Sequence, residues 1–213
     1  MKSRISLRER KRGSSSSYAP RILCKRRGGA LYKYPRLRRG GKISEEILKK
    51  ITTEEKLAWA TSTHMATLVI RGETIFAPMV GAEKYKEINT KVYGEGGKIL
   101  FPMVKESYKI PVEDAIGAAI LADVVGELTV GPGFEGETVE ETPERVVART
   151  TKCPWMEKYK EYKVDPKFIP CVEGHEAWGD MGVKAIDPRL SFKMLKAMPK
   201  GDPYCEYAYE FKK

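Results

Sequence analysis

The stretch LSFKMLKAMPKGDPYCEYAYEF, residues 190–211, decides the fold class. Its first part predicts a strand in which every second side chain is large and apolar: Leu190, Phe192 and Met194. Its last part predicts a second strand with a polar outer face, whose apolar positions are Cys205, Tyr207, Tyr209 and Phe211. The turn-forming residues PKGDP, 199–203, stand between the two, so we expect a hairpin.

The residues before this hairpin predict helices. Thr52 and Glu55 make a capping box, and the helix after it carries on roughly one face Leu57, Ala60, Thr61, Met65 and Leu68. A second helical stretch covers residues 82–108, where a break or kink is expected at Gly94, Gly96, Gly97 and Pro102. A third helix is expected to start at Pro111 and to end at residues 131–133, Gly-Pro-Gly.

The remaining segments complete the prediction of the fold. Residues 145–151 form a short segment rich in β-branched side chains, which predicts a strand. Residues 154–162 indicate a helix. The acidic run 135–144 is most simply a solvated hairpin or loop. Together these segments predict an α+β fold, with N-terminal helices packed on a C-terminal antiparallel sheet that has a helical insert.

Charge divides the chain in two. Residues 1–42 hold 15 of the 39 basic residues and one acid, Glu9, a net charge of +14, whereas the remaining residues have a net charge of −4. We expect residues 1–42 to be a basic disordered leader and residues 43–213 to be a single domain. The leader is either an arm that contacts phosphates or an over-extended start, because Arg-Arg-Gly-Gly at 38–41 is what a purine-rich ribosome-binding sequence encodes. Nucleic acid is expected as a partner only if the leader is translated.

Composition excludes several classes of protein. No run of 18 apolar residues occurs, so no membrane partner is expected. Four widely spaced cysteines, with no secretory signal, predict a cytoplasmic protein with free or metal-bound thiols. The absence of Gln, with Asn89 as the only Asn, is typical of a thermophilic source. The expected partner is a small molecule, and a homo-oligomer is left open.

Candidate chemistry gathers in the last third of the chain. A zinc or iron site would use three thiols and an imidazole, namely Cys153, Cys171, His175 and Cys205. Alternatively, His175 lowers the pKa of Cys171 or Cys153 to make a nucleophile, with water-activating bases among Glu176, Asp202 and Glu206. A third reading makes the cysteines small buried hydrophobes and leaves the protein without a cofactor.

Short motifs over residues 52–211 resemble a known family. Cys153-Pro154-Trp155, then Cys171, Asp187-Pro188-Arg189-Leu190 and a closing GDPYCEY at 201–207 resemble the L-2-amino-thiazoline-4-carboxylic acid hydrolase-like family, which has many archaeal members. The closing motif is also similar to the end of 4-vinyl reductase domains, which are small α+β modules associated with small-molecule binding.

The resemblance leads to two functional hypotheses. The first family implies a hydrolase that opens a cyclic amidine, with Cys153, Cys171, Asp202 and Cys205 at the matching positions. The second implies a small-molecule- or metal-binding module without catalysis. A hydrolase needs an activated water, a proton donor and a cation that holds the carboxylate of the substrate.

Overall fold

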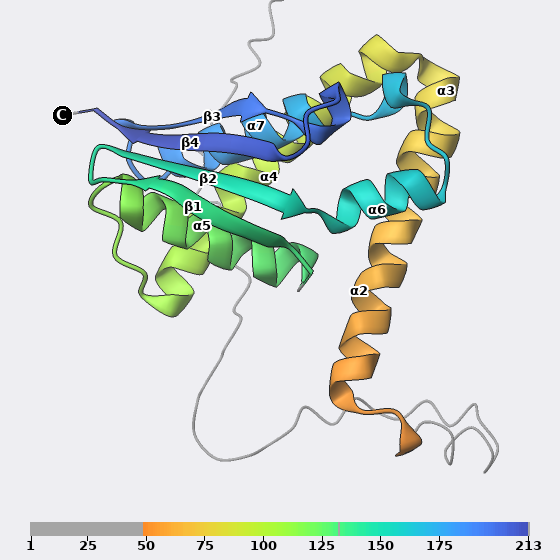
Figure 1. Ribbon diagram of the computed structural model, residues 1–213, viewed down its shortest axis with the longest axis horizontal. Helices are drawn as coiled ribbons and strands as arrows, with labels where there is room; N and C mark the ends of the chain where they lie inside the picture. Colours follow the sequence, from red (N-terminus) through yellow and green to blue (C-terminus); the bar gives the residue numbers. More distant parts are fainter. Residues whose placement is uncertain (1–48, 132, 213) are drawn as a thin grey trace, which may run out of the picture. The chain divides into compact units, whose positions relative to one another are not determined.

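Alternating side chains form an antiparallel sheet in the computed structural model, which describes residues 49–131 and 133–212. Within these residues the strands are β1 (Glu135–Glu141), β2 (Arg145–Lys152), β3 (Leu190–Lys196) and β4 (Cys205–Phe211). Their order is β1-β2-β4-β3, so β1 and β3 are the edge strands (Figure 1). The predicted leader, residues 1–42, lies outside the described residues.

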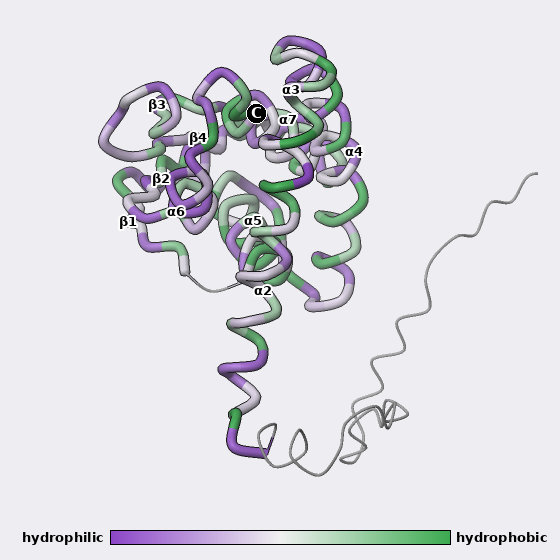
Figure 2. The backbone as a smooth tube through the Cα atoms, turned by 90° about the vertical axis from the view of Figure 1, so that its right-hand side faces the viewer, coloured by the Kyte–Doolittle hydropathy of each residue, from purple (hydrophilic) through white to green (hydrophobic). Residues whose placement is uncertain are grey.

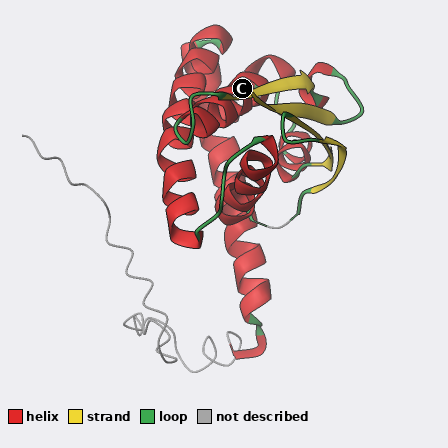
Figure 3. Ribbon diagram, turned by 90° about the vertical axis from the view of Figure 1, so that its left-hand side faces the viewer, coloured by secondary structure: helices red, strands yellow, loops and turns green. Residues whose placement is uncertain are grey.

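Both expected hairpins are confirmed. Strand β3 pairs antiparallel with β4, and Phe192 stands opposite Tyr209. The connection contains a short 3-10 helix, Met198–Lys200, and turns at Gly201, whose φ of 97° is a conformation that favours glycine. The acidic run forms β1 and its turn into β2. The α+β class is confirmed, since Figure 3 shows helices together with strands. Along the sequence, helices come in the N-terminal part and strands towards the C-terminus.

Helices α4 (Ala82–Tyr108), α5 (Ala115–Val130) and α7 (Cys171–Lys184) lie on one face of the sheet (Figure 1). The main core joins them to the inward side chains of the strands, and its large buried members include Phe101, Leu121, Leu190, Phe192 and Tyr209. Burial of these large side chains is the main favourable term for this arrangement.

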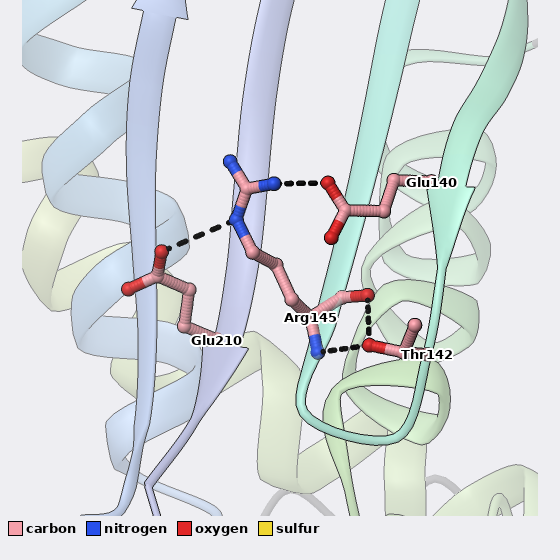
Figure 4. Close-up of polar contacts among 4 residues, drawn as sticks. All are labelled: Glu140, Thr142, Arg145 and Glu210. Atoms are coloured by element: carbon pink, nitrogen blue, oxygen red, sulfur yellow. Dashed lines mark hydrogen bonds and ion pairs between the residues drawn. The ribbon is translucent and has the colours of Figure 1, made fainter.

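The other face of the sheet carries ion pairs. Arg145 on β2 reaches Glu140 on β1 and Glu210 on β4, and its backbone is tied to the Thr142 hydroxyl (Figure 4). These cross-strand pairs are solvent-exposed, so each contributes little more than about 0.2–1 kcal/mol. The predicted polar outer face of the last strand is therefore present.

The expected break in the second helix is wrong. Helix α4 is continuous from Ala82 to Tyr108, although it contains Gly94, Gly96, Gly97 and Pro102. Gly94 and Gly97 are buried against α7, and a Cβ on Gly97 would collide with the carbonyl oxygen of Trp178. Gly94 and Gly97 allow the close approach of α4 and α7, and they do not mark the end of a helix.

Side-chain N-caps set the first residue of two helices. The capping box of Thr52 and Glu55 is confirmed at the start of α2 (Thr53–Val69). Helix α5 begins at Ala115 rather than at Pro111, because the Asp114 side chain accepts a hydrogen bond from the Gly117 amide.

Helix α2 continues into a π-helical segment, η1 (Ile70–Phe76), and then into α3 (Ala77–Val80). Of the predicted apolar face of α2, Met65 is buried, but Leu57 is 58% and Leu68 39% exposed. Figure 2 shows hydrophilic and hydrophobic residues mixed along this helix. No helix in the described part of the chain is long and apolar enough to cross a membrane.

Gly97→Ala is expected to lower the free energy of unfolding by about 1–3 kcal/mol, because its new methyl group would push α4 away from the α7 backbone. The matched control is Gly96→Ala, where an added Cβ meets no atom within 4 Å. This control is expected to raise the free energy of unfolding by about 0.5–1 kcal/mol. Urea denaturation of both variants tests the pair, and equal effects would contradict the close helix contact.

Candidate functional site

Helix α7 runs along the edge strand β3 and binds its free backbone amides. Glu176 Oε2 accepts a hydrogen bond from the Met194 amide at 3.1 Å, and Asp180 Oδ1 accepts one from the Phe192 amide at 3.2 Å. Four residues of helix rise about 6 Å and two residues of strand about 6.6 Å, so the spacings match. The first role of Glu176 is therefore to satisfy an amide at the sheet edge.

Asp202 continues this pattern past the end of the strand. Its Oδ2 accepts a hydrogen bond from the Ala197 amide at 2.8 Å, and Cys205 Sγ accepts one from the Met198 amide at 3.4 Å. The pairing of β3 with β4 is irregular between Met194 and Lys196. Irregular pairing of this kind re-aims side chains near binding sites.

A small cavity opens at this irregularity. Its volume is about 80 Å³, and its lining comes from α7, the end of β3 and the following turn: Val172, Glu176, Met194, Leu195, Lys196, Ala197, Lys200 and Asp202. The structure thus brings together two of the predicted site residues, Glu176 and Asp202. Lys196 and Lys200 add positive charge, and no ion pair to Lys200 is found among the described residues.

The three described thiols lie near one another but are not activated. Cys153 precedes α6 (Pro154–Glu161), Cys171 begins α7 and Cys205 begins β4. Burial raises the pKa of all three, and charge on Cys153 or Cys205 would raise the pKa of Cys171 further. Desolvation therefore favours the neutral thiol over the thiolate that a nucleophile would need.

His175 does not partner a thiolate either. Its ring packs between Trp178, Phe192 and Tyr207, with ring centroids 5.3–5.7 Å apart. Desolvation lowers the pKa of His175 to about 4, so the imidazole is neutral at pH 7. An aromatic setting of this kind serves packing rather than the stabilisation of a thiolate.

The metal alternative finds no support in the geometry. Across residues 49–131 and 133–212, no group of three or more His, Cys, Asp or Glu side chains is arranged to hold a metal ion. The residues Cys153, Cys171, His175 and Cys205 all lie within these ranges and form no such group. The three thiols are free cysteines.

Glu206 lies apart from the cavity, in the ion-pair network of the outer face. Arg149 Nε donates to its Oε2 at 2.6 Å, and Lys196 Nζ lies 3.8 Å from its Oε1. The hydrogen bond from Arg149 lowers the pKa of Glu206, so this carboxylate is a weak base. Arg149 and Lys196 also lie over the Tyr204 ring, at 4.7 and 4.8 Å from its centroid.

Sequence reasoning missed Glu73, a buried carboxyl on η1. Its side chain is 4% exposed, and the pKa of the group is raised to about 7, chiefly by desolvation. The available signal was an acid placed between apolar residues in the stretch VIRGETIF, 69–76. That pattern also occurs on exposed helix faces, so sequence alone does not single it out.

We expect the His175 ring to titrate near pH 4 in the folded protein and near 6.5 in the unfolded chain. Since the unfolded state binds the proton more tightly, the contribution of His175 to stability is present above pH 6.5 and is lost as the pH falls through 4. His175→Phe should remove this slope of up to about 1.4 kcal/mol per pH unit. An NMR titration of the ring checks it, and a midpoint above pH 6 in the folded state would refute the assignment of a desolvated, neutral ring.

Comparisons with known proteins give only distant structural likenesses. No family model matches the chain, and no curated protein matches it. Similar solved structures include subunit 3 of a trafficking protein particle complex from Naegleria fowleri, covalently bound to palmitic acid, with a TM-score of 0.46, 11% identity, and coverage of 71% of this chain and 96% of that one. Another is the phenol-responsive sensory domain of the transcription activator PoxR with phenol, with a TM-score of 0.43, 10% identity, and coverage of 71% and 73%.

Proposed function

We propose that this protein is a small-molecule-binding module whose binding site is the cavity between α7 and β3. One observation carries the proposal: two carboxylates with fixed positions and two lysines line the same cavity. Glu176 and Asp202 are each held by a backbone amide, so they need little reordering when a ligand binds. Such a preorganised, mixed-charge lining favours a small polar ligand.

The ligand class follows from the charges and the volume. A cavity of about 80 Å³ takes one end of a small molecule rather than a drug-sized ligand. Lys200 lacks an ion-pair partner among the described residues, so we assign to it an ion pair with the carboxylate of the ligand. The second oxygens of Glu176 and Asp202 would then accept hydrogen bonds from an amine or amidine on the same molecule.

Hydrolysis of a cyclic amidine stays a prediction of the family resemblance. The chemistry of the predicted residues favours binding instead, because the thiols are protonated, His175 is neutral and Glu206 is paired with Arg149. A cytoplasmic location and a homo-oligomer are kept as predictions, and the free thiols favour the former.

Calorimetric titration with 2-amino-thiazoline-4-carboxylate and with small amino acids tests the site. We expect saturable binding of at least one carboxylate, weakened at least about tenfold in Lys200→Ala through loss of a charged hydrogen bond. Lys193→Ala is the matched control, because Lys193 is exposed on β3, the strand that borders the cavity, and does not line the cavity.

Equal affinity in Lys200→Ala and the wild type would refute the assignment of the cavity. Product analysis on the same samples tests the enzyme hypothesis. Turnover that is lost in Cys171→Ala or Cys153→Ala would favour the hydrolase over the binding module, whereas binding without turnover supports the module.

A further inference from the structure

Glu73 presents a buried carboxylate oxygen that has no partner among the described residues. The Tyr85 hydroxyl donates to Oε1 at 3.1 Å, while Oε2 has no hydrogen-bond partner and no exposed surface. Gly72 permits this arrangement, because a Cβ at that position would collide with the Tyr85 hydroxyl. Buried acceptors are nearly always satisfied in folded proteins, so Oε2 calls for a donor.

No positively charged side chain among residues 49–131 and 133–212 pairs with this carboxylate. The ion pairs of the described residues do not include Glu73, and the groups that affect its pKa include no Lys, Arg or His side chain. Within the described part of the chain, the carboxyl group therefore has only neutral donors and no counter-ion. A buried charge without a partner is unfavourable, so the site favours whatever supplies positive charge to it.

Side chains from three further helices lie within electrostatic reach of Glu73 and carry further acceptors. Tyr93 comes from α4, Tyr159 from α6 and Cys171 from the start of α7. Charge on Glu73 raises the pKa of each of the three, which places them within electrostatic reach of the carboxylate. No hydrogen bond to the hydroxyl of Tyr93 or Tyr159 is found in the described part of the chain.

The chemistry of this cluster matches one kind of group. A primary ammonium carries one positive charge and three N–H donors, and the cluster offers a carboxylate oxygen and tyrosine hydroxyls as acceptors. Tyrosine rings also attract cations. Calcium or magnesium would need six or more oxygen ligands, and an anion would be repelled by Glu73.

We propose that Glu73, together with Tyr85, Tyr93 and Tyr159, forms a second binding site that takes a primary ammonium group of a small molecule. The site is distinct from the cavity between α7 and β3, and it does not depend on the function proposed for that cavity. Because Oε2 is closed off from solvent, binding requires the packing around Glu73 to open briefly and to close again over the ammonium.

Titration of the whole protein with ethylammonium tests the proposal, with ethanol as the neutral probe of the same size. We expect saturable binding of ethylammonium alone, and a loss of at least about tenfold in Glu73→Gln, which keeps the shape of the side chain. Glu83→Gln is the matched control, because Glu83 is exposed at the start of α4 and is expected to leave the affinity unchanged.

The dependence on pH gives a second readout. The groups facing Glu73 that titrate are Tyr85, Tyr93, Tyr159 and Cys171, and all four have a raised pKa, so only the carboxyl changes charge near neutrality. Affinity should therefore fall roughly tenfold per pH unit below 7 as the carboxyl is protonated. A pH-independent affinity would overturn the proposal.

Tyr93→Phe is a second variant that tests the site if Glu73→Gln does not fold. It retains the ring and removes one acceptor, so it should weaken ethylammonium binding a few-fold. Equal binding of ethanol, unchanged affinity in Glu73→Gln or in Tyr93→Phe, or no binding of ethylammonium at millimolar concentration would each overturn the site.

Discussion

The close approach of α4 and α7 is the contact on which the rest of the structure depends. Gly97 on α4 lies against the backbone of α7, and Gly182 on α7 leaves room for the Phe101 ring of α4. That ring also meets Trp178 edge-on, with centroids 4.8 Å apart. Because the glycines bring the two helices together, α7 lies close enough to β3 for its acidic side chains to reach the strand. A wider spacing between α4 and α7 would shift α7, and the wall of the cavity that α7 forms would shift with it.

The acidic side chains near β3 show how a structural role and a binding role share one residue. A carboxylate has two oxygens. The backbone of β3 uses one oxygen of Glu176, and the backbone just after β3, at Ala197, uses one oxygen of Asp202. The structural bond fixes the rotamer of each side chain, which leaves the other oxygen with a defined direction. Acidic residues that the sequence suggests as catalytic bases here accept hydrogen bonds from backbone amides.

Local patterns predicted the parts of the fold that depend on local physics. The alternation in residues 205–211 predicted β4, and Thr52 with Glu55 predicted the start of α2. The patterns were wrong where distant segments decide the outcome. Gly94 and Gly97 indicated a break, yet they pack under α7, a contact that no local window contains.

The candidate site was predicted less well than the fold. Glu176 and Asp202 do meet in one cavity, but the pKa of each cysteine depends on burial, which the spacing of residues does not reveal. Glu73 was missed for the same reason. Its chemistry comes from Tyr85, Tyr93 and Tyr159, which stand 12, 20 and 86 positions further along the chain.

The two edges of the sheet also bear on how copies of this protein behave at high concentration. An open edge strand offers unpaired amides and carbonyls to any neighbouring strand and so invites aggregation. At β3 the acids of α7 already bind the outward amides of Phe192 and Met194. At the opposite edge, β1 reads EGETVEE and its pairing with β2 is twice irregular, so charge and shape both oppose the addition of a further strand. Both edges of the sheet are therefore protected against strand-to-strand polymerisation. Helix α7 protects the β3 edge, and acidic repulsion protects the β1 edge.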